Sequence, residues 1–436
     1  MISRLRSRIS QSTLIKSFII TLMGSGFSKV VLVIASFVCS NLLTQAEFGE
    51  FSFIRNTLNL ILVICGLNYA SICTKFATEA KNSEKAKTRL LLVFLFSVFL
   101  CVSIGLLLYF LPNELLIKWF KGDSVVHYFR IIGLMLPIFI LHPLFEGVLR
   151  GYMKFKLIGI FQSATSVFFL LAVYCGIYVN GYQGAIAGMI IYYAICSLFM
   201  IPFVINSSKK LSAIRHHFKT LRSELSIIKT IIIPIFLTSF IEAPVSWLSQ
   251  LILMHSSSYS EIASMTAIAQ IKNLAILIPS YFFGTFIAFA GRMNAEKNYK
   301  EYFTKFNQIG LQITVWGLVL SFSLILFGKS ILRLYGPEYP DDYTPYIISI
   351  CGITLSLRSS LLKISLVIRE YQQALLINSI VWSVSWLIIL YAMIEFTQIS
   401  PLNSYFISLF IAIVIQYLDI QYIYYKDKQK IRKQLI

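Results

Sequence analysis

Residues 157–205 read LIGIFQSATSVFFLLAVYCGIYVNGYQGAIAGMIIYYAICSLFMIPFVI and contain no Asp, Glu, Lys or Arg. A transmembrane helix needs about 20 mostly apolar residues, so this stretch can hold two spans, which we place at 157–179 and 183–205. Because lipid offers no hydrogen-bond partner to the backbone, each span is expected to be an α-helix. The apolar residues are continuous rather than alternating, which argues against a β-barrel.

The remainder of the chain has the same character. Of its 436 residues, 57% are hydrophobic and only 13% are charged, whereas soluble domains carry about 25% charge; a soluble enzyme is therefore excluded. Further apolar runs lie at 14–42, 51–74, 90–111, 125–149, 226–254, 262–290, 308–327, 344–368, 373–394 and 401–424. We predict an all-α integral membrane protein with twelve transmembrane helices.

The distribution of basic residues predicts the orientation. The chain has 38 Lys and Arg against 19 Asp and Glu. If both termini lie on one side, the loops and termini of that side hold 28 Lys and Arg, counting Lys16 and Lys229 at the edges of their spans, and the opposite loops hold 4. Lys and Arg accumulate on the cytoplasmic side of membrane proteins. Both termini are therefore predicted to be cytoplasmic, and the positive charge indicates topology rather than a nucleic-acid partner.

A weak internal repeat divides the chain. Pairing residue i with residue i+214 matches Glu47 with Glu261 and Asn59 with Asn273. Two short amphipathic segments, LPNELLIKWF at 111–120 and LFGKSILRLY at 326–335, also occupy similar places in the two halves. We predict two six-helix lobes, 1–205 and 226–436, joined by a cytoplasmic linker at 206–225. Parallel repeats of this kind usually enclose a central cavity.

Cations inside the predicted spans are the main functional feature. A charge at the bilayer centre costs about 2.5–3.5 kcal/mol on insertion scales, so an excess of cations needs acids, water or an anionic cargo. The intramembrane acids are few: Glu146 and Glu242, with Asp419 near a span end. We predict that the cations contact an anionic substrate; snorkelling and internal ion pairs are the alternatives. The cations are Lys29, Arg55, Arg130, Lys272, Arg358 and Lys363.

Two amides and three titratable residues complete the candidate site. Asn59 and Asn273 could hydrogen-bond to the substrate or could bridge helices. His142 and Glu146 share one helical face with Arg150, and Glu242 lies between two prolines. The candidates for coupling to H⁺ or Na⁺ are His142, Glu146 and Glu242. A Glu146–Arg150 pair and a structural kink at Glu242 are the alternatives. The sequence has no metal-ligand spacing and no nucleotide-binding loop, so no metal or cofactor is predicted.

Two segments resemble a known family. LLTQAEFGEFSFIRNTLNLI at 42–61 and LFEGVLRGYMKFK at 144–156 resemble the polysaccharide transport branch of the multidrug/oligosaccharidyl-lipid/polysaccharide exporter (MOP) superfamily, which includes the O-antigen flippases of the Wzx type. The second half departs from this pattern, because Ala263 and Ser264 replace Gly49 and Glu50.

The resemblance implies a function and a location. It implies a secondary transporter of the bacterial inner membrane, not an enzyme. Such a transporter flips undecaprenyl-pyrophosphate-linked O-antigen units from the cytoplasmic to the periplasmic leaflet by alternating access. Its surroundings are membrane lipids, and the O-antigen polymerase and the chain-length regulator are candidate protein partners.

Two other functions stay open on sequence grounds. A membrane O-antigen polymerase or glycosyltransferase should carry a large outer loop, but the longest outer loop here is about 328–343. A multidrug or cation antiporter of the same superfamily should have an acidic cavity, whereas the intramembrane charges of this chain are mostly basic.

Overall fold

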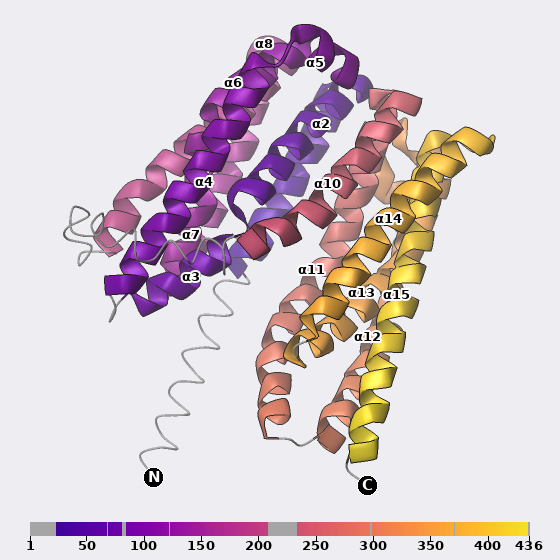
Figure 1. The fold of residues 1–436 in the computed structure, drawn as a ribbon. Helices are drawn as coiled ribbons and strands as arrows, with labels where there is room; N and C mark the ends of the chain where they lie inside the picture. The colour runs from indigo at the N-terminus through magenta and orange to yellow at the C-terminus, as the bar shows by residue number, and fades with distance from the viewer. Residues whose placement is uncertain are drawn as a thin grey trace. The chain divides into compact units, whose positions relative to one another are not determined.

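The computed structural model describes residues 23–67, 69–80, 84–121, 123–207, 233–296, 299–369 and 371–434. Throughout these residues the regular structure is helical (Figure 1). The chain divides into two compact units. The first comprises Met1–Leu43 and Phe51–Ala243, and the second comprises Thr44–Glu50 and Pro244–Ile436.

The first unit begins with the helix Met23–Leu42. Within it α4 packs against α6, α3 packs against α7, and α7 packs against α8. Buried apolar residues of α7 and α8, such as Leu149, Phe161 and Met200, form a core cluster between these two helices. The further elements are α2 (Gln45–Leu62, from Phe51 onward in this unit), the π-helix η1 (Val63–Leu67), α3 (Tyr69–Glu79), α4 (Glu84–Phe110), α5 (Asn113–Phe120), α6 (Asp123–Phe139), α7 (Leu141–Gly151) and α8 (Phe155–Ser207).

The second unit is arranged around α13 (Tyr343–Ile368), which packs against α11, α12 and α15. The helix α14 packs mainly against α15. The other elements are α10 (Ile233–Ser256, from Pro244 onward in this unit), α11 (Tyr259–Ala295), α12 (Tyr299–Arg333), the 3₁₀ helix η4 (Tyr339–Asp342), α14 (Gln372–Phe396) and α15 (Pro401–Gln434).

The prediction of a multi-pass α-helical membrane protein is confirmed. Within the described ranges, 9 helices are long and apolar enough to cross a membrane. One of these, Phe155–Phe203, joins the two spans predicted at 157–179 and 183–205. Its backbone leaves helical geometry at Asn180 and Gly181, where Gly181 adopts a φ of +54°. Glycine tolerates this left-handed conformation, so the turn between the two spans is built at this position.

Two elements differ from the sequence-based expectation. The span predicted at 125–149 remains one stretch, Val126–Gly151, that is long and apolar enough to cross a membrane. Its helix is interrupted at Ile140 between α6 and α7, because Pro143 has no N–H to donate to the Phe139 carbonyl. The amphipathic segment at 111–120 does form a separate helix, α5, which starts after Pro112. The matching segment at 326–335 has no such proline, and α12 continues through it to Arg333.

The predicted linker at 206–225 lies, apart from residues 206 and 207, outside the described residues. Residues 14–22 of the span predicted at 14–42 also lie outside the described residues.

Candidate functional site

Lys272 of α11 is a partly buried cation in the second unit. Its side chain reaches α13: a Cβ added at Gly352 would lie 3.9 Å from Lys272 Nζ. This is an ordinary van der Waals distance, so the ammonium group lies beside α13 at Gly352. Within the part of the chain that the structure describes, Lys272 forms no ion pair and no hydrogen bond. Its positive charge is thus not compensated by a described carboxylate.

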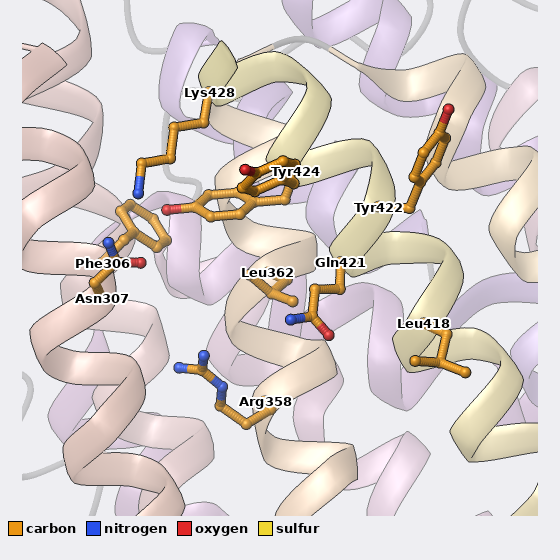
Figure 2. A pocket seen from close by; sticks show the side chains of 10 residues that line it. Phe306, Asn307, Arg358, Leu362, Leu418, Gln421, Tyr422, Tyr424 and Lys428 are labelled. Atoms are coloured by element: carbon orange, nitrogen blue, oxygen red, sulfur yellow. The ribbon is translucent and has the colours of Figure 1, made fainter. Parts of the chain in front are cut away.

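Arg358 lies on a different face of α13. It follows Gly352 by six residues, which turns the helix by about 240°. There it lines a pocket of about 410 Å³ between α12, α13 and α15 (Figure 2). No acidic residue is among the described side chains that line this pocket, and Lys272 is not among them either. The lining residues are Phe306, Asn307, Arg358, Leu362, Leu418, Gln421, Tyr422, Tyr424, Tyr425 and Lys428.

The guanidinium of Arg358 is fitted closely against α12. A Cβ added at Gly310 would collide with Arg358 Nη1, so glycine at this position admits the guanidinium. At the end of the pocket nearer the C-terminus, the rings of Phe303 and Phe306 meet the ring of Tyr424 with centroids 5.7 and 6.4 Å apart. These aromatic contacts join α12 to α15 beside the pocket.

The predicted cations of the first unit have different surroundings. Lys29 is exposed on the helix Met23–Leu42. Arg55 Nη1 donates to Ser36 Oγ at 3.4 Å. Arg130 Nη2 donates to Asn113 Oδ1 of α5 at 2.5 Å, an arrangement that favours the snorkelling alternative for this residue. Lys363, in the second unit, is partly buried on α13.

The two predicted amides also differ. Asn59 Oδ1 accepts a hydrogen bond from Tyr193 Oη at 3.3 Å, which joins α2 to α8 and supports the bridging alternative. Asn273 is exposed on α11, next to Lys272.

His142 and Glu146 lie on α7 of the first unit. Glu146 forms an ion pair with Arg150 one turn later, as the alternative reading predicts, and it accepts a hydrogen bond from Gln162 Nε2 at 2.8 Å. Gln162 in turn accepts a hydrogen bond from Ser25 at 2.6 Å. His142 Nε2 is buried without a hydrogen-bond partner among the described residues.

Glu242 is exposed on α10, two residues before Pro244 inside the same helix. The structure does not bring it into the network of Glu146. Among the described residues, no group of three or more His, Cys, Asp or Glu side chains could hold a metal ion.

Lys428 and Gln421 belong to the pocket but were not singled out by the sequence. The available pattern is the helical spacing of Leu418, Gln421, Tyr425 and Lys428 along α15, which places polar and apolar residues on one face. Spacing alone could not reveal that Arg358 of α13 faces the same space.

Comparisons with known proteins show the fold. No family model matches the chain, and no curated protein matches it by sequence. Solved structures match over nearly the whole chain. One, described as the inward-facing conformation of a multidrug resistance MATE family transporter of the MOP superfamily, has a TM-score of 0.77 at 14% identity and covers 93% of this chain and 96% of its own. The fold is that of the MATE transporters.

Two further MATE-like structures agree. A MOP superfamily transporter from Pyrococcus furiosus, described as having a binding pocket of reverse polarity, has a TM-score of 0.69 at 15% identity and covers 96% of both chains. A Vibrio cholerae MATE transporter variant has a TM-score of 0.63 at 17% identity, with 96% of this chain and 97% of its own covered. At such identities the likeness concerns the fold.

Proposed function

We propose that this protein is a secondary transporter that flips undecaprenyl-pyrophosphate-linked oligosaccharide units across the bacterial inner membrane. The observation that carries the proposal is that no carboxylate in the described part of the chain compensates Lys272, in a MATE-like fold. A buried cation without a carboxylate is costly, and a pyrophosphate would supply the missing negative charge. Lysine acts as a point charge toward such a group.

The polarity of the chain supports an anionic substrate over a cationic one. Glu146 is engaged by Arg150 and Gln162, and Asp427 is engaged by Arg369. These carboxylates are therefore already neutralised by the protein. A structurally similar MOP transporter is described as having a pocket of reverse polarity that suggests a different function, so the fold is compatible with a change of substrate charge.

The multidrug or cation antiporter is the second candidate, because several structures of this fold are described as MATE multidrug transporters. The polymerase or glycosyltransferase reading is weaker. Between α12 and η4 the chain has only a short turn, in which Tyr335 is buried, and this leaves little room for a catalytic outer domain.

Complementation of a strain that lacks its own flippase tests the proposal. We expect the wild-type chain to restore surface glycan and Lys272→Gln to lower it by about tenfold or more, since a charge-assisted contact contributes about 1.5–3 kcal/mol. Lys305→Gln near the start of α12 removes the same charge from another place and is the matched control. Normal surface glycan in Lys272→Gln at equal protein level would contradict the proposal.

The coupling step is proposed to use H⁺ at His142. Its Nε2 is buried and without a described partner, Glu146 and Arg150 lie on the same helix, and the ring of Phe161 lies 5.8 Å away. Imidazole is the side chain that titrates most readily near neutral pH. We expect His142→Gln to flatten the pH dependence of transport and Lys305→Gln, on α12, to preserve it. An unchanged pH profile in His142→Gln removes this residue from the coupling step.

A further inference from the structure

The pocket around Arg358 lies at the depth where lipid headgroups are expected. On α15 the apolar Leu418 is followed by Tyr422 and Tyr425, and then by Lys426 and Lys430. Tyrosine is enriched at the membrane interface, and basic residues follow on the cytoplasmic side. On α12 the order is the mirror image, because Lys305 and Asn307 precede the apolar stretch that starts near Leu311. The pocket therefore lies at one interface.

The mouth of the pocket opens onto apolar surface. Leu418, Tyr422 and Tyr425 follow one another at helical spacing on α15 and are 59%, 65% and 58% exposed. On α12, Leu311 lies one turn from Asn307 and is 66% exposed, and Val315 continues the same face. An apolar ligand chain could lie along both faces, as membrane lipid does around a spanning helix.

The floor of the pocket is cationic. Arg358 and Lys428 extend from α13 and α15 toward Asn307 of α12 (Figure 2). Arg358 forms no ion pair or hydrogen bond within the described chain, and Lys428 Nζ lies 6.0 Å from the ring of Phe303. The nearby Asp427 is held by Arg369 and Tyr371 and does not line the pocket. Two cations and two amides without an acid suit a phosphate group.

We propose that this pocket binds the headgroup phosphate of an anionic phospholipid from the surrounding membrane. Arg358 and Lys428 hold the phosphate, and the acyl chains follow the exposed faces of α12 and α15. This assignment separates Arg358 from the transported substrate and does not depend on the proposed transport function.

Binding of phosphatidylglycerol to the purified full-length chain, followed by native mass spectrometry, tests the inference. Arg358→Gln and Lys428→Gln are each expected to weaken phosphatidylglycerol binding about tenfold. Gly310→Ala is expected to act in the same direction by displacing the Arg358 guanidinium. Lys426→Gln and Lys430→Gln are the matched controls, because these lysines are exposed on the same helix outside the pocket. Phosphatidylcholine is expected to bind the wild type and every variant equally.

Two results would overturn the inference. One is equal phosphatidylglycerol binding by the pocket variants and the control variants. The other is that Arg358→Gln and Lys428→Gln weaken the binding of undecaprenyl pyrophosphate while phosphatidylglycerol binding stays unchanged, since the pocket would then belong to the transported lipid. Thermal unfolding of each variant checks its folding, and Lys428, close to the end of α15, provides a variant that does not disturb α13.

Discussion

The carboxylate of Asp427 is an ion whose charge is balanced by partners within the protein. It accepts hydrogen bonds from Arg369 Nε and Nη2 at 3.1 and 3.2 Å and from Tyr371 Oη at 2.8 Å. Arg369 also donates to Asn294 of α11 at 3.1 Å. This network joins the ends of α11, α13 and α15, and it contrasts with Lys272 and Arg358, which have no such partner among the described residues.

Removing Asp427 is expected to destabilise the protein strongly. Breaking a buried ion pair by removing one partner costs about 3–5 kcal/mol, because the other charge stays buried. Asp427→Ala should therefore lower the thermal unfolding temperature clearly in detergent. Glu395→Ala, at an exposed position of α14, should stay within about 0.5 kcal/mol of the wild type. Equal unfolding temperatures of the two variants would show that the network contributes little.

Asp342 of η4 gives a prediction on pH. Burial raises the pKa of its carboxyl above 3.8, and the charge of Asp341 raises it further, although the hydroxyl of Ser264 donates to it and opposes the shift. The folded protein therefore holds this proton at a pH where the unfolded chain has lost it. Stability must then fall as pH rises from about 3.8 through the folded pKa.

The measurement for Asp342 is thermal unfolding between pH 4 and pH 7. Asp342→Asn should remove this part of the slope and should be at least as stable as the wild type at pH 7. Asp341→Asn should retain most of the slope, because burial is the larger cause of the shift. If the stability of Asp342→Asn still falls with rising pH as in the wild type, the pH dependence belongs to another group.

At the element scale, glycines set how closely helices approach. Gly49, in the segment that carries the family resemblance, lies against α11: a Cβ there would collide with the Tyr259 carbonyl and lie 3.2 Å from Ala263 N. Gly49 and Ala263 are paired by the i+214 alignment, so the residues that differ between the two copies meet at this contact. The sequence could identify the small residues but not the helix that each one faces.

A matched pair of glycines tests this packing. On the helix Met23–Leu42, a Cβ at Gly24 would lie 2.5 Å from Gly159 Cα, whereas a Cβ at Gly26 would meet nothing within 4 Å. Gly24→Ala is expected to destabilise the first unit by about 1–3 kcal/mol through overpacking. Gly26→Ala should be neutral or stabilise it by up to about 1 kcal/mol, since Ala favours helix. Thermal unfolding that ranks the two variants in the opposite order would contradict the packing seen here.

The helices themselves were largely predictable, because apolar length and the scarcity of charge determine where a chain can span lipid. Breaks were harder to place. Pro137 and Pro143 both lie in the span predicted at 125–149, yet only the structure shows that α6 ends at Phe139 and α7 begins at Leu141. The pocket could not be predicted, because it depends on which faces of α12, α13 and α15 meet, and apolar residues surround each of these helices.

At the scale of the whole molecule, the sequence predicted a multi-pass α-helical membrane protein, and the MATE-like fold agrees with that expectation over nearly the full chain. The assignment of segments to the compact units was not predictable. Thr44–Glu50, at the start of α2, group with the second unit. Two of these residues contact α11, since Gly49 lies against the Tyr259 carbonyl and Gln45 donates to Ser264 at 3.1 Å.

The most direct test of the transport proposal is a flipping assay in proteoliposomes that contain a fluorescent undecaprenyl-pyrophosphate oligosaccharide. The fraction of the lipid that a membrane-impermeant reagent can reach is measured over time, with and without a proton gradient. The proposal predicts faster flipping with the wild-type chain, about tenfold slower flipping with Lys272→Gln, and wild-type flipping with Lys305→Gln. Flipping that is no faster than in protein-free vesicles, together with export of a cationic dye by the same preparation, would contradict it.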